Sequence, residues 1–153
     1  MLTDTHCHLF YEQIKNDLES VLERSRKLGV NRFICVATNL NDAEECLELS
    51  QRYDCIYASA GIHPHDSKDA PSNFKEKIYD FMKNEKMVAL GEMGLDYFRN
   101  VSSPKIQKRI FSLSNHIFLT YLIVFYPFLL QRFNVAQLIF INILDIVIHV
   151  LLH

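Results

Sequence analysis

The 153-residue sequence is poor in the residues that mark non-globular chains, since it contains four glycines and four prolines. This scarcity argues against low-complexity and fibrous proteins. No charge is in large excess either, because 16 lysines and arginines stand against 18 aspartates and glutamates. The balance excludes a protein that binds nucleic acid through a basic surface alone, and it excludes an acidic disordered chain. By length, the chain fits one domain.

Several local motifs are also missing. No two of the four cysteines form a Cys-x-x-Cys pair, so zinc knuckles and thioredoxin-type sites are excluded. Their scatter is typical of a reduced, intracellular protein, which we expect to be cytoplasmic. The amino terminus has neither a basic segment nor an apolar run, and therefore is not a secretory signal. No phosphate-binding glycine loop and no Gly-x-Ser-x-Gly motif occur.

Charge is distributed very unevenly along the chain. Residues 112–153 contain only two charged side chains, Arg132 and Asp145, and the rest of the charge lies in residues 1–111. The averaged apolar content of 49% therefore hides two compositions. We expect a folded unit at 1–111 and an apolar, helical tail at 112–153.

Short apolar runs alternate with amphipathic stretches in the first unit. The runs at 2–6, 33–37, 56–60 and 88–90 predict strands, and helical spacing predicts helices at 14–28, 41–49 and 74–82. Asn41 and Glu44 have the spacing of a helix N-cap and its partner. This alternation predicts an α/β fold with a parallel sheet. Both an open doubly wound sheet and a (β/α)8 barrel are compatible with it.

Polar residues capable of chemistry follow three of the predicted strands, where parallel α/β folds carry their functional groups. His6 and His8 are two apart, so on a strand their imidazoles point the same way and can share a metal ion. Glu92, after the fourth strand, would add an oxygen ligand. The alternative is a pair of surface histidines at a strand end.

Other residues nearby allow two interpretations each. His63 and His65 flank Pro64. They either belong to a tight turn that Pro64 fixes, or they support a ligand or contact a substrate phosphate. Asp96 either orients a ligand or caps a loop, and Asp4 either supports a ligand histidine or belongs to a turn. Cys7 would point to the opposite face from the histidines, as a small core residue.

Three segments together resemble successive signatures of the TatD-related deoxyribonucleases, which belong to the amidohydrolase-like metal-dependent hydrolases. They are Thr-Asp-Thr-His-Cys-His-Leu at 3–9, Gly-Ile-His-Pro-His at 61–65 and Gly-Glu-Met-Gly-Leu-Asp-Tyr at 91–97. Order and spacing both match, and the similarity extends through about residue 111.

The resemblance implies a TIM-like (β/α)8 barrel that binds two divalent metal ions at its carboxyl-terminal mouth. These ions would be Mg²⁺, Mn²⁺ or Zn²⁺. His6, His8 and Glu92 would be the metal ligands, with Glu92 bridging the ions, and His63 would be catalytic. The implied reaction is hydrolysis of DNA phosphodiester bonds, with DNA as the partner and no protein partner evident. A complete barrel needs ~250 residues, so we expect residues 1–111 to form its amino-terminal half. The implied further ligands, two histidines and an aspartate, have no counterpart that we can follow after residue 111.

The tail leaves three interpretations open. It is foreign to the fold, or a membrane segment based on the uncharged stretch 111–131, or a divergent continuation in which Asp145-Ile-Val-Ile-His149 is a fifth strand. Two functions therefore compete with a nuclease. One is a non-catalytic or membrane-associated remnant, and the other is an amidohydrolase-type enzyme acting on a small substrate.

Overall fold

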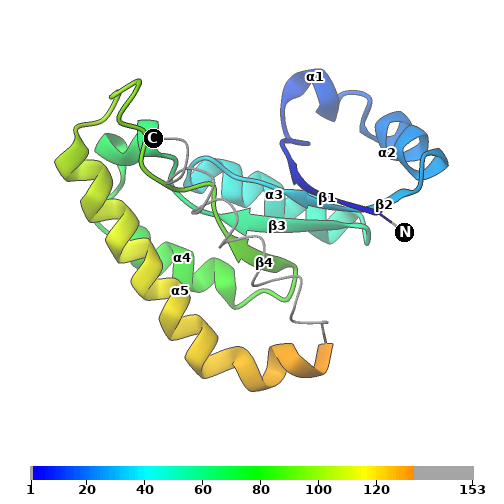
Figure 1. Cartoon of the computed structure of the whole chain (residues 1–153). Helices are drawn as coiled ribbons and strands as arrows, with labels where there is room; N and C mark the ends of the chain where they lie inside the picture. Colours follow the sequence, from blue (N-terminus) through cyan, green and yellow to red (C-terminus); the bar gives the residue numbers. More distant parts are fainter. Residues whose placement is uncertain (1, 133–153) are drawn as a thin grey trace.

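The structure is a computed structural model that describes residues 2–132. Along this part of the chain, β-strands alternate with helices, as Figure 1 shows. The strands are β1 (Leu2–Cys7), β2 (Val30–Cys35), β3 (Ile56–Ala60) and β4 (Met87–Leu90). The helices are α1 (Glu12–Lys15), α2 (Leu18–Lys27), α3 (Leu40–Arg52), the 3-10 helix η1 (Pro64–Asp69), α4 (Phe74–Met82) and α5 (Pro104–Arg132).

The strands form one parallel sheet in the order β1-β2-β3-β4. A doubly wound sheet reverses its strand order at a switch point, whereas a barrel adds each strand beside the last. The sequential order therefore decides between the two architectures that the sequence left open. The fold is α/β, and it corresponds to the amino-terminal half of a TIM-like barrel.

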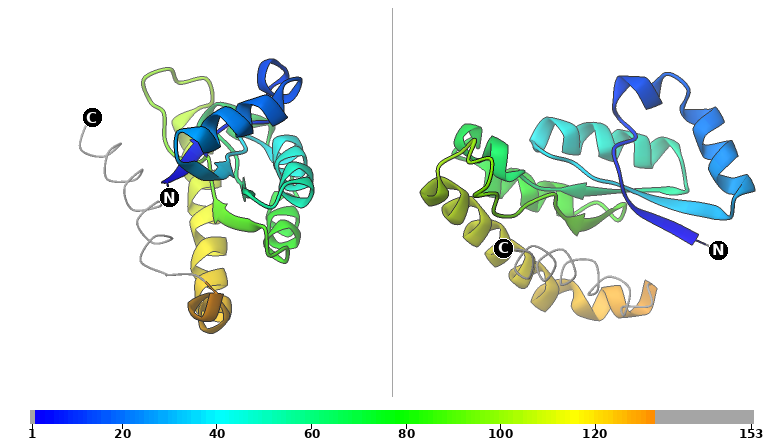
Figure 2. Two further views of the ribbon diagram at one scale, coloured as in Figure 1. Left: turned by 90° about the vertical axis from the view of Figure 1, so that its right-hand side faces the viewer. Right: turned by 45° about the horizontal axis from the view of Figure 1, so that its top comes forward.

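Helices cover one side of this sheet. In the left view of Figure 2, α2, α3 and α4 form an arc around the strands. The core lies between the sheet and these helices. Apolar side chains of both layers form it, including Phe33 and Ile56 of the sheet and Leu22 and Ile78 of the helices. Strand β1 is much more exposed than β2 and β3, and the Leu2 side chain is 60% exposed.

The prediction of one continuous helix at 14–28 is wrong, because the structure has two helices there, α1 and α2. Asn16 follows the last residue of α1 and Asp17 precedes α2, with Asp17 at φ −129° and ψ 28°, outside the helical region. The apolar spacing runs through this break, whereas Asn and Asp compete with the helical backbone for hydrogen bonds. Gly29 follows α2 at a φ of +89°, which glycine adopts readily.

The predicted N-cap of α3 is also wrong. Asn39, not Asn41, occupies this position, and its side-chain oxygen accepts hydrogen bonds from the backbone N–H groups of Asn41 and Asp42. The predicted strand at 33–37 begins earlier, at Val30, and ends at Cys35. The strands at 56–60 and near 88–90 and the helix at 74–82 are confirmed.

The tail is helical as far as the structure describes it. Helix α5 begins at Pro104 and runs without interruption across the predicted boundary at 111 to Arg132. Within residues 2–132, no helix combines the length and apolar character needed to cross a membrane. The proposed fifth strand at Asp145–His149 lies outside the described residues.

Candidate metal centre

Backbone hydrogen bonds draw the carboxyl ends of the strands together. The N–H of Gly91 donates to the Ala60 carbonyl at 3.0 Å, and the N–H of Glu92 donates to the Ala37 carbonyl at 2.7 Å. A Cβ atom on Gly61 would lie 2.7 Å from the carbonyl carbon of Gly91, so this approach requires glycine. The segment after β4 is thus held across the ends of β2 and β3, which fixes where Glu92 projects.

A buried hydroxyl reinforces this arrangement. Ser59 on β3 is 1% exposed, and its Oγ donates to the Gly91 carbonyl at 2.5 Å. The same Oγ accepts a hydrogen bond from the Ala37 N–H at 3.3 Å. One side chain therefore links the ends of β2 and β4 through β3.

The Glu92 carboxylate lies at the centre of three imidazoles. Its Oε2 is 3.4 Å from His6 Nε2 and 3.9 Å from His8 Nε2, and its Oε1 is 3.7 Å from His63 Nε2. His6 and His8 come from the end of β1, and their ring centroids are 5.3 Å apart. The structure therefore brings together the four residues expected to bind metal or take part in catalysis, which are His6, His8, His63 and Glu92.

The hydrogen bonds of His8 and His63 differ in a way that separates their chemistry. His8 Nδ1 lies 2.7 Å from the Val36 carbonyl, which can only accept, so Nδ1 carries the hydrogen and Nε2 presents a lone pair. His63 Nδ1 instead accepts from the His65 N–H at 3.2 Å. The neutral His63 ring therefore carries its hydrogen on Nε2, the atom that faces Glu92. Burial lowers the pKa of His63, partly opposed by the charge of Glu92, and this favours the neutral ring.

His65 and Asp96 form a pair beside this cluster. His65 Nε2 lies 2.7 Å from Asp96 Oδ2, and the two rings of His65 and His63 pack edge to face with centroids 4.5 Å apart. Asp96 Oδ1 also accepts a hydrogen bond from the Arg99 N–H at 2.9 Å. This bond, assisted by His65, lowers the pKa of Asp96. Asp96 therefore caps the loop that follows it, which was one of its two interpretations, and it also contacts a histidine outside the set of predicted metal ligands.

The buried Gln107 of α5 holds the backbone of Asp96, the partner of His65, in place. Its Oε1 accepts from the Asp96 N–H, and its Nε2 donates to the carbonyls of Asp96 and Ser102. Ser102 in turn donates from Oγ to the His65 carbonyl at 2.7 Å. Helix α5 is therefore tied to the loops that follow both β3 and β4.

Two further expectations can be compared with the geometry. Asp4 Oδ1 accepts from the His6 N–H at 3.1 Å, but Asp4 lies within β1 and pairs with Phe33 of β2, so the predicted turn is wrong. Cys7 packs against the core and its Sγ donates to the Ile34 carbonyl, which confirms a structural role.

Sequence reasoning missed Ser59 and Gln107. For Gln107 a signal exists, because Gln107, Ile110, Ser114 and Ile117 recur at helical spacing and all are buried. A polar residue within such a stripe needs hydrogen-bond partners inside the fold. Ser59 lies in a continuous apolar run, and its role depends on the approach of the segment after β4, which the local sequence does not reveal.

The donor set of the cluster fits a divalent cation. One ligand atom from each of His6, His8 and Glu92 lies within 4.8 Å of the other two. The separations of 3.4 and 3.9 Å from Glu92 to the histidines are close to the ~3.4 Å expected of two donors ~2.1 Å from a shared tetrahedral ion. Mixed nitrogen and oxygen donors suit zinc, manganese and related ions. Glu92 is 33% exposed, so solvent reaches the centre.

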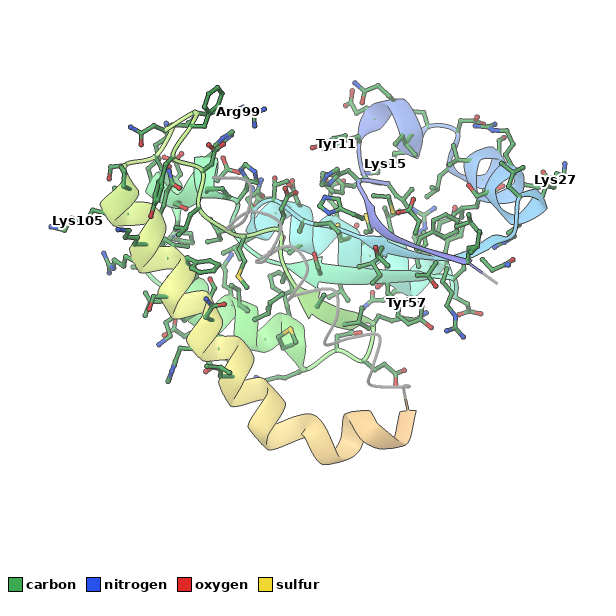
Figure 3. The ribbon with its side chains drawn as sticks, viewed as in Figure 1. Tyr11, Lys15, Lys27, Tyr57, Arg99 and Lys105 are labelled. Carbon is green, nitrogen blue, oxygen red and sulfur yellow. The ribbon has the colours of Figure 1, made fainter. Side chains whose placement is uncertain are left out.

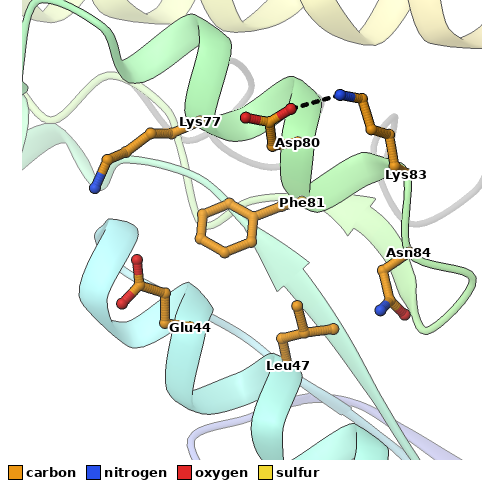
Figure 4. Close-up of a pocket in the computed structure, with 7 residues that line it drawn as sticks. All are labelled: Glu44, Leu47, Lys77, Asp80, Phe81, Lys83 and Asn84. Carbon is orange, nitrogen blue, oxygen red and sulfur yellow. Dashed lines mark hydrogen bonds and ion pairs between the residues drawn. The ribbon is translucent and has the colours of Figure 1, made fainter.

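A groove elsewhere on the molecule lacks these features. It lies between α3 and α4 and is lined by Glu44 and Leu47 of α3 and by Lys77 and Phe81 of α4, as Figure 4 shows. None of its lining residues belongs to the histidine–glutamate cluster. The groove is therefore separate from the candidate metal centre.

Comparison with known proteins gives consistent matches. The sequence is 41% identical over 111 residues to the "Uncharacterized metal-dependent hydrolase YabD" of Bacillus subtilis, covering 72% of this chain and 44% of that protein. It is 36% identical over 108 residues to the "3'-5' ssDNA/RNA exonuclease TatD" of Citrobacter koseri, covering 71% and 42%. The chain therefore spans less than half the length of these relatives.

The fold has a matching crystal structure, that of the TatD homologue YjjV from Escherichia coli K12. The TM-score is 0.70 at 28% sequence identity, over 76% of this chain and 46% of that one. A sequence model of one family, described as "TatD related DNase", matches residues 3–117. The chain accordingly belongs to the TatD related DNase family.

Proposed function

We propose that this chain carries the amino-terminal part of a metal-dependent nuclease site that hydrolyses phosphodiester bonds of DNA. The observation that carries the proposal is the convergence of His6, His8 and Glu92 at strand ends, within 4.8 Å of one another, in a chain of this family. Metal-dependent hydrolase and ssDNA/RNA exonuclease are the names of the relatives reported above.

In this proposal His6, His8 and Glu92 hold the divalent ion. The lone pair of His8 Nε2 is directed by the bond from its Nδ1 to the Val36 carbonyl, the arrangement that orients ligand histidines in metalloproteins. Glu92 Oε2 faces the two histidines at the end of β1, whereas Oε1 faces His63, so Oε2 is the ligand atom in this proposal. When bound, a divalent ion supplies Lewis acidity toward a phosphate and lowers the pKa of a bound water.

His63 has a different proposed role. Its Nε2 carries a hydrogen and so offers no lone pair to a metal ion, but it can donate to an oxygen of the scissile phosphate. Such a donor stabilises the negative charge that develops during hydrolysis. The His65–Asp96 pair and the His65 N–H keep the His63 ring in this orientation.

The test is hydrolysis of labelled oligonucleotides by the purified full chain with Mg²⁺, Mn²⁺ or Zn²⁺, and with EDTA as the metal-free control. Substrates are single-stranded DNA, duplex DNA and RNA, because the TatD relatives are named for both ssDNA and RNA. A parallel assay with small amides and esters addresses the amidohydrolase alternative. We expect metal-dependent release of nucleotides from DNA and no turnover of the small substrates.

Two variants separate the proposed roles. Glu92→Gln should weaken metal binding at least tenfold and abolish hydrolysis, whereas His63→Gln should retain metal binding and lose hydrolysis by roughly 10²-fold or more. Absence of metal-dependent hydrolysis by the unmodified chain would refute the proposed activity. Hydrolysis that survives Glu92→Gln would refute the assignment of its site.

A further inference from the structure

The exposed aromatic side chains of the described residues lie at one end of the molecule. Among the phenylalanines and tyrosines whose side chains the structure describes, the exposed ones are Tyr11 (45%), Tyr97 (47%) and Phe98 (87%). Tyr11 follows β1, and Tyr97 and Phe98 follow β4, so all three are at the carboxyl ends of strands. Figure 3 labels Tyr11 and Arg99 on these two loops. These are also the two strands whose ends carry His6, His8 and Glu92.

The loop that presents Phe98 is anchored at its base. Gln107 binds both the N–H and the carbonyl of Asp96, and the Asp96 carboxylate accepts from the Arg99 N–H. Asn100 turns the chain with a φ of +49°. The Phe98 ring therefore projects into solvent from a loop whose backbone is already fixed. Binding of a ligand to this ring would cost little conformational entropy in the loop.

Cationic side chains accompany Tyr97 and Phe98 on this loop and at the start of α5. The Arg99 side chain is 68% exposed, with its Nη1 3.8 Å from Asp96 Oδ2, and Lys108 Nζ lies 5.8 Å from the centroid of the Tyr97 ring. Lys105 is also exposed at the start of α5 and is labelled in Figure 3. Aromatic faces combined with cations are the means by which proteins bind single-stranded nucleic acid, with bases on the rings and phosphates near the cations.

On the other side of the metal centre, Tyr11 is held differently. Its ring stacks on His8 with centroids 5.1 Å apart and planes inclined by 18°. One face of Tyr11 is therefore occupied by a candidate ligand, and one face of Tyr97 by Lys108. Phe98 is the most exposed of the three and is the best placed to accept a base.

We propose that Phe98, supported by Tyr97, stacks on an unpaired base of a single-stranded DNA whose phosphate lies at the candidate metal centre. The inference rests on the proposed function, and it deepens it by naming how the substrate is held. A single strand is specified because bases within a duplex already have both faces covered. Arg99 and Lys108 would contact the phosphates that flank the stacked base.

The first experiment uses the absence of tryptophan from the chain. Phe98→Trp introduces a single tryptophan that keeps an aromatic ring at the proposed position. Leu28→Trp is the matched control, because Leu28 is 81% exposed and directly precedes Gly29 and β2, at the opposite end of the sheet. Fluorescence is followed in EDTA, so that neither metal binding nor hydrolysis contributes, with a thymidine oligomer, an abasic oligomer of equal length and a blunt duplex as probes.

We expect the thymidine oligomer to quench the fluorescence of Phe98→Trp, with much less quenching by the abasic oligomer and the duplex and none in Leu28→Trp. Equal quenching in both variants, or no quenching by any probe, would overturn the proposal. In an anisotropy titration, Phe98→Ala should weaken binding of the thymidine oligomer about tenfold, with Phe98→Trp restoring it. Leu28→Ala should bind as the unmodified chain does.

The outcomes distinguish this proposal from the proposed function. Quenching without metal-dependent hydrolysis would retain the stacking surface and refute the nuclease activity. Hydrolysis without quenching, and with unchanged affinity in Phe98→Ala, would retain the nuclease activity and refute the stacking surface.

Discussion

At the scale of single residues, the hydrogen bonds of the imidazoles matter as much as their positions. His8 and His63 face the same carboxylate, yet the partner of each Nδ1 differs, since one is a carbonyl and the other an N–H. The first arrangement leaves a lone pair on Nε2, and the second leaves a hydrogen there. One histidine is thereby suited to bind a metal ion and the other to donate to a substrate.

This difference can be measured directly. In ¹⁵N-labelled protein at pH 7.5 without metal, long-range ¹H–¹⁵N spectra should show His8 protonated on Nδ1 and His63 protonated on Nε2, because their Nδ1 partners impose opposite tautomers. His63→Gln and His8→Gln assign the signals. The same tautomer at both positions would contradict the division of roles.

Asp96 gives a second prediction, for stability as a function of pH. The Arg99 N–H and His65 lower its pKa in the fold, so the unfolded carboxyl takes up a proton first as the pH falls below ~4. The stabilisation is complete above that pH and is lost as the pH falls through the lowered pKa. Urea unfolding should therefore show that Asp96→Asn is destabilising at pH 6 and much less so at pH 3. A destabilisation that does not change between these pH values would argue against the charge of Asp96 as its source.

At the scale of secondary-structure elements, helix ends decide local stability. Asn39→Ala should reduce the free energy of unfolding by about 1 kcal/mol, because it leaves the N–H groups of Asn41 and Asp42 without their side-chain acceptor. Asn41→Ala is the matched control at the position that the spacing alone suggests, and it should have little effect. Urea denaturation of both variants checks this, and the reverse order of effects would show that the cap is assigned incorrectly.

The same scale shows what could be predicted from the sequence. The proximity of His6, His8 and Glu92 could be predicted, because side chains two apart share a strand face and the carboxyl ends of parallel strands converge. The break between α1 and α2 could not, because the apolar stripe continues across Asn16 and Asp17 while the backbone does not.

Ser59 and Gln107 depend on contacts between elements. Ser59 acts where β2 and the segment after β4 approach each other, and Gln107 acts where α5 meets two loops. Short-range spacing does not specify such approaches. These two residues hold the backbone around the candidate site and do not belong to its motifs. Sequence motifs that point to candidate ligands therefore do not point to them.

At the scale of the whole molecule, the described residues form a sheet with two edges, β1 and β4. The candidate ligands lie at the carboxyl ends of these two strands, His6 and His8 at one edge and Glu92 at the other. The hydrogen bond from the Glu92 N–H to the Ala37 carbonyl holds the segment after β4 across the sheet, with the Glu92 carboxylate beside His6 and His8. The site thus depends on the half-barrel as a unit, although its residues belong to short motifs.

The most direct measurement is calorimetric titration of the purified full chain with Mn²⁺. We predict saturable binding that Glu92→Gln and His8→Ala each weaken by at least tenfold, since each removes one donor of the cluster. His116→Ala should bind as the unmodified chain does, because His116 lies on α5 and is not part of the cluster. Absence of binding by the unmodified chain, or equal binding by Glu92→Gln, would contradict the assignment of His6, His8 and Glu92 as a metal centre.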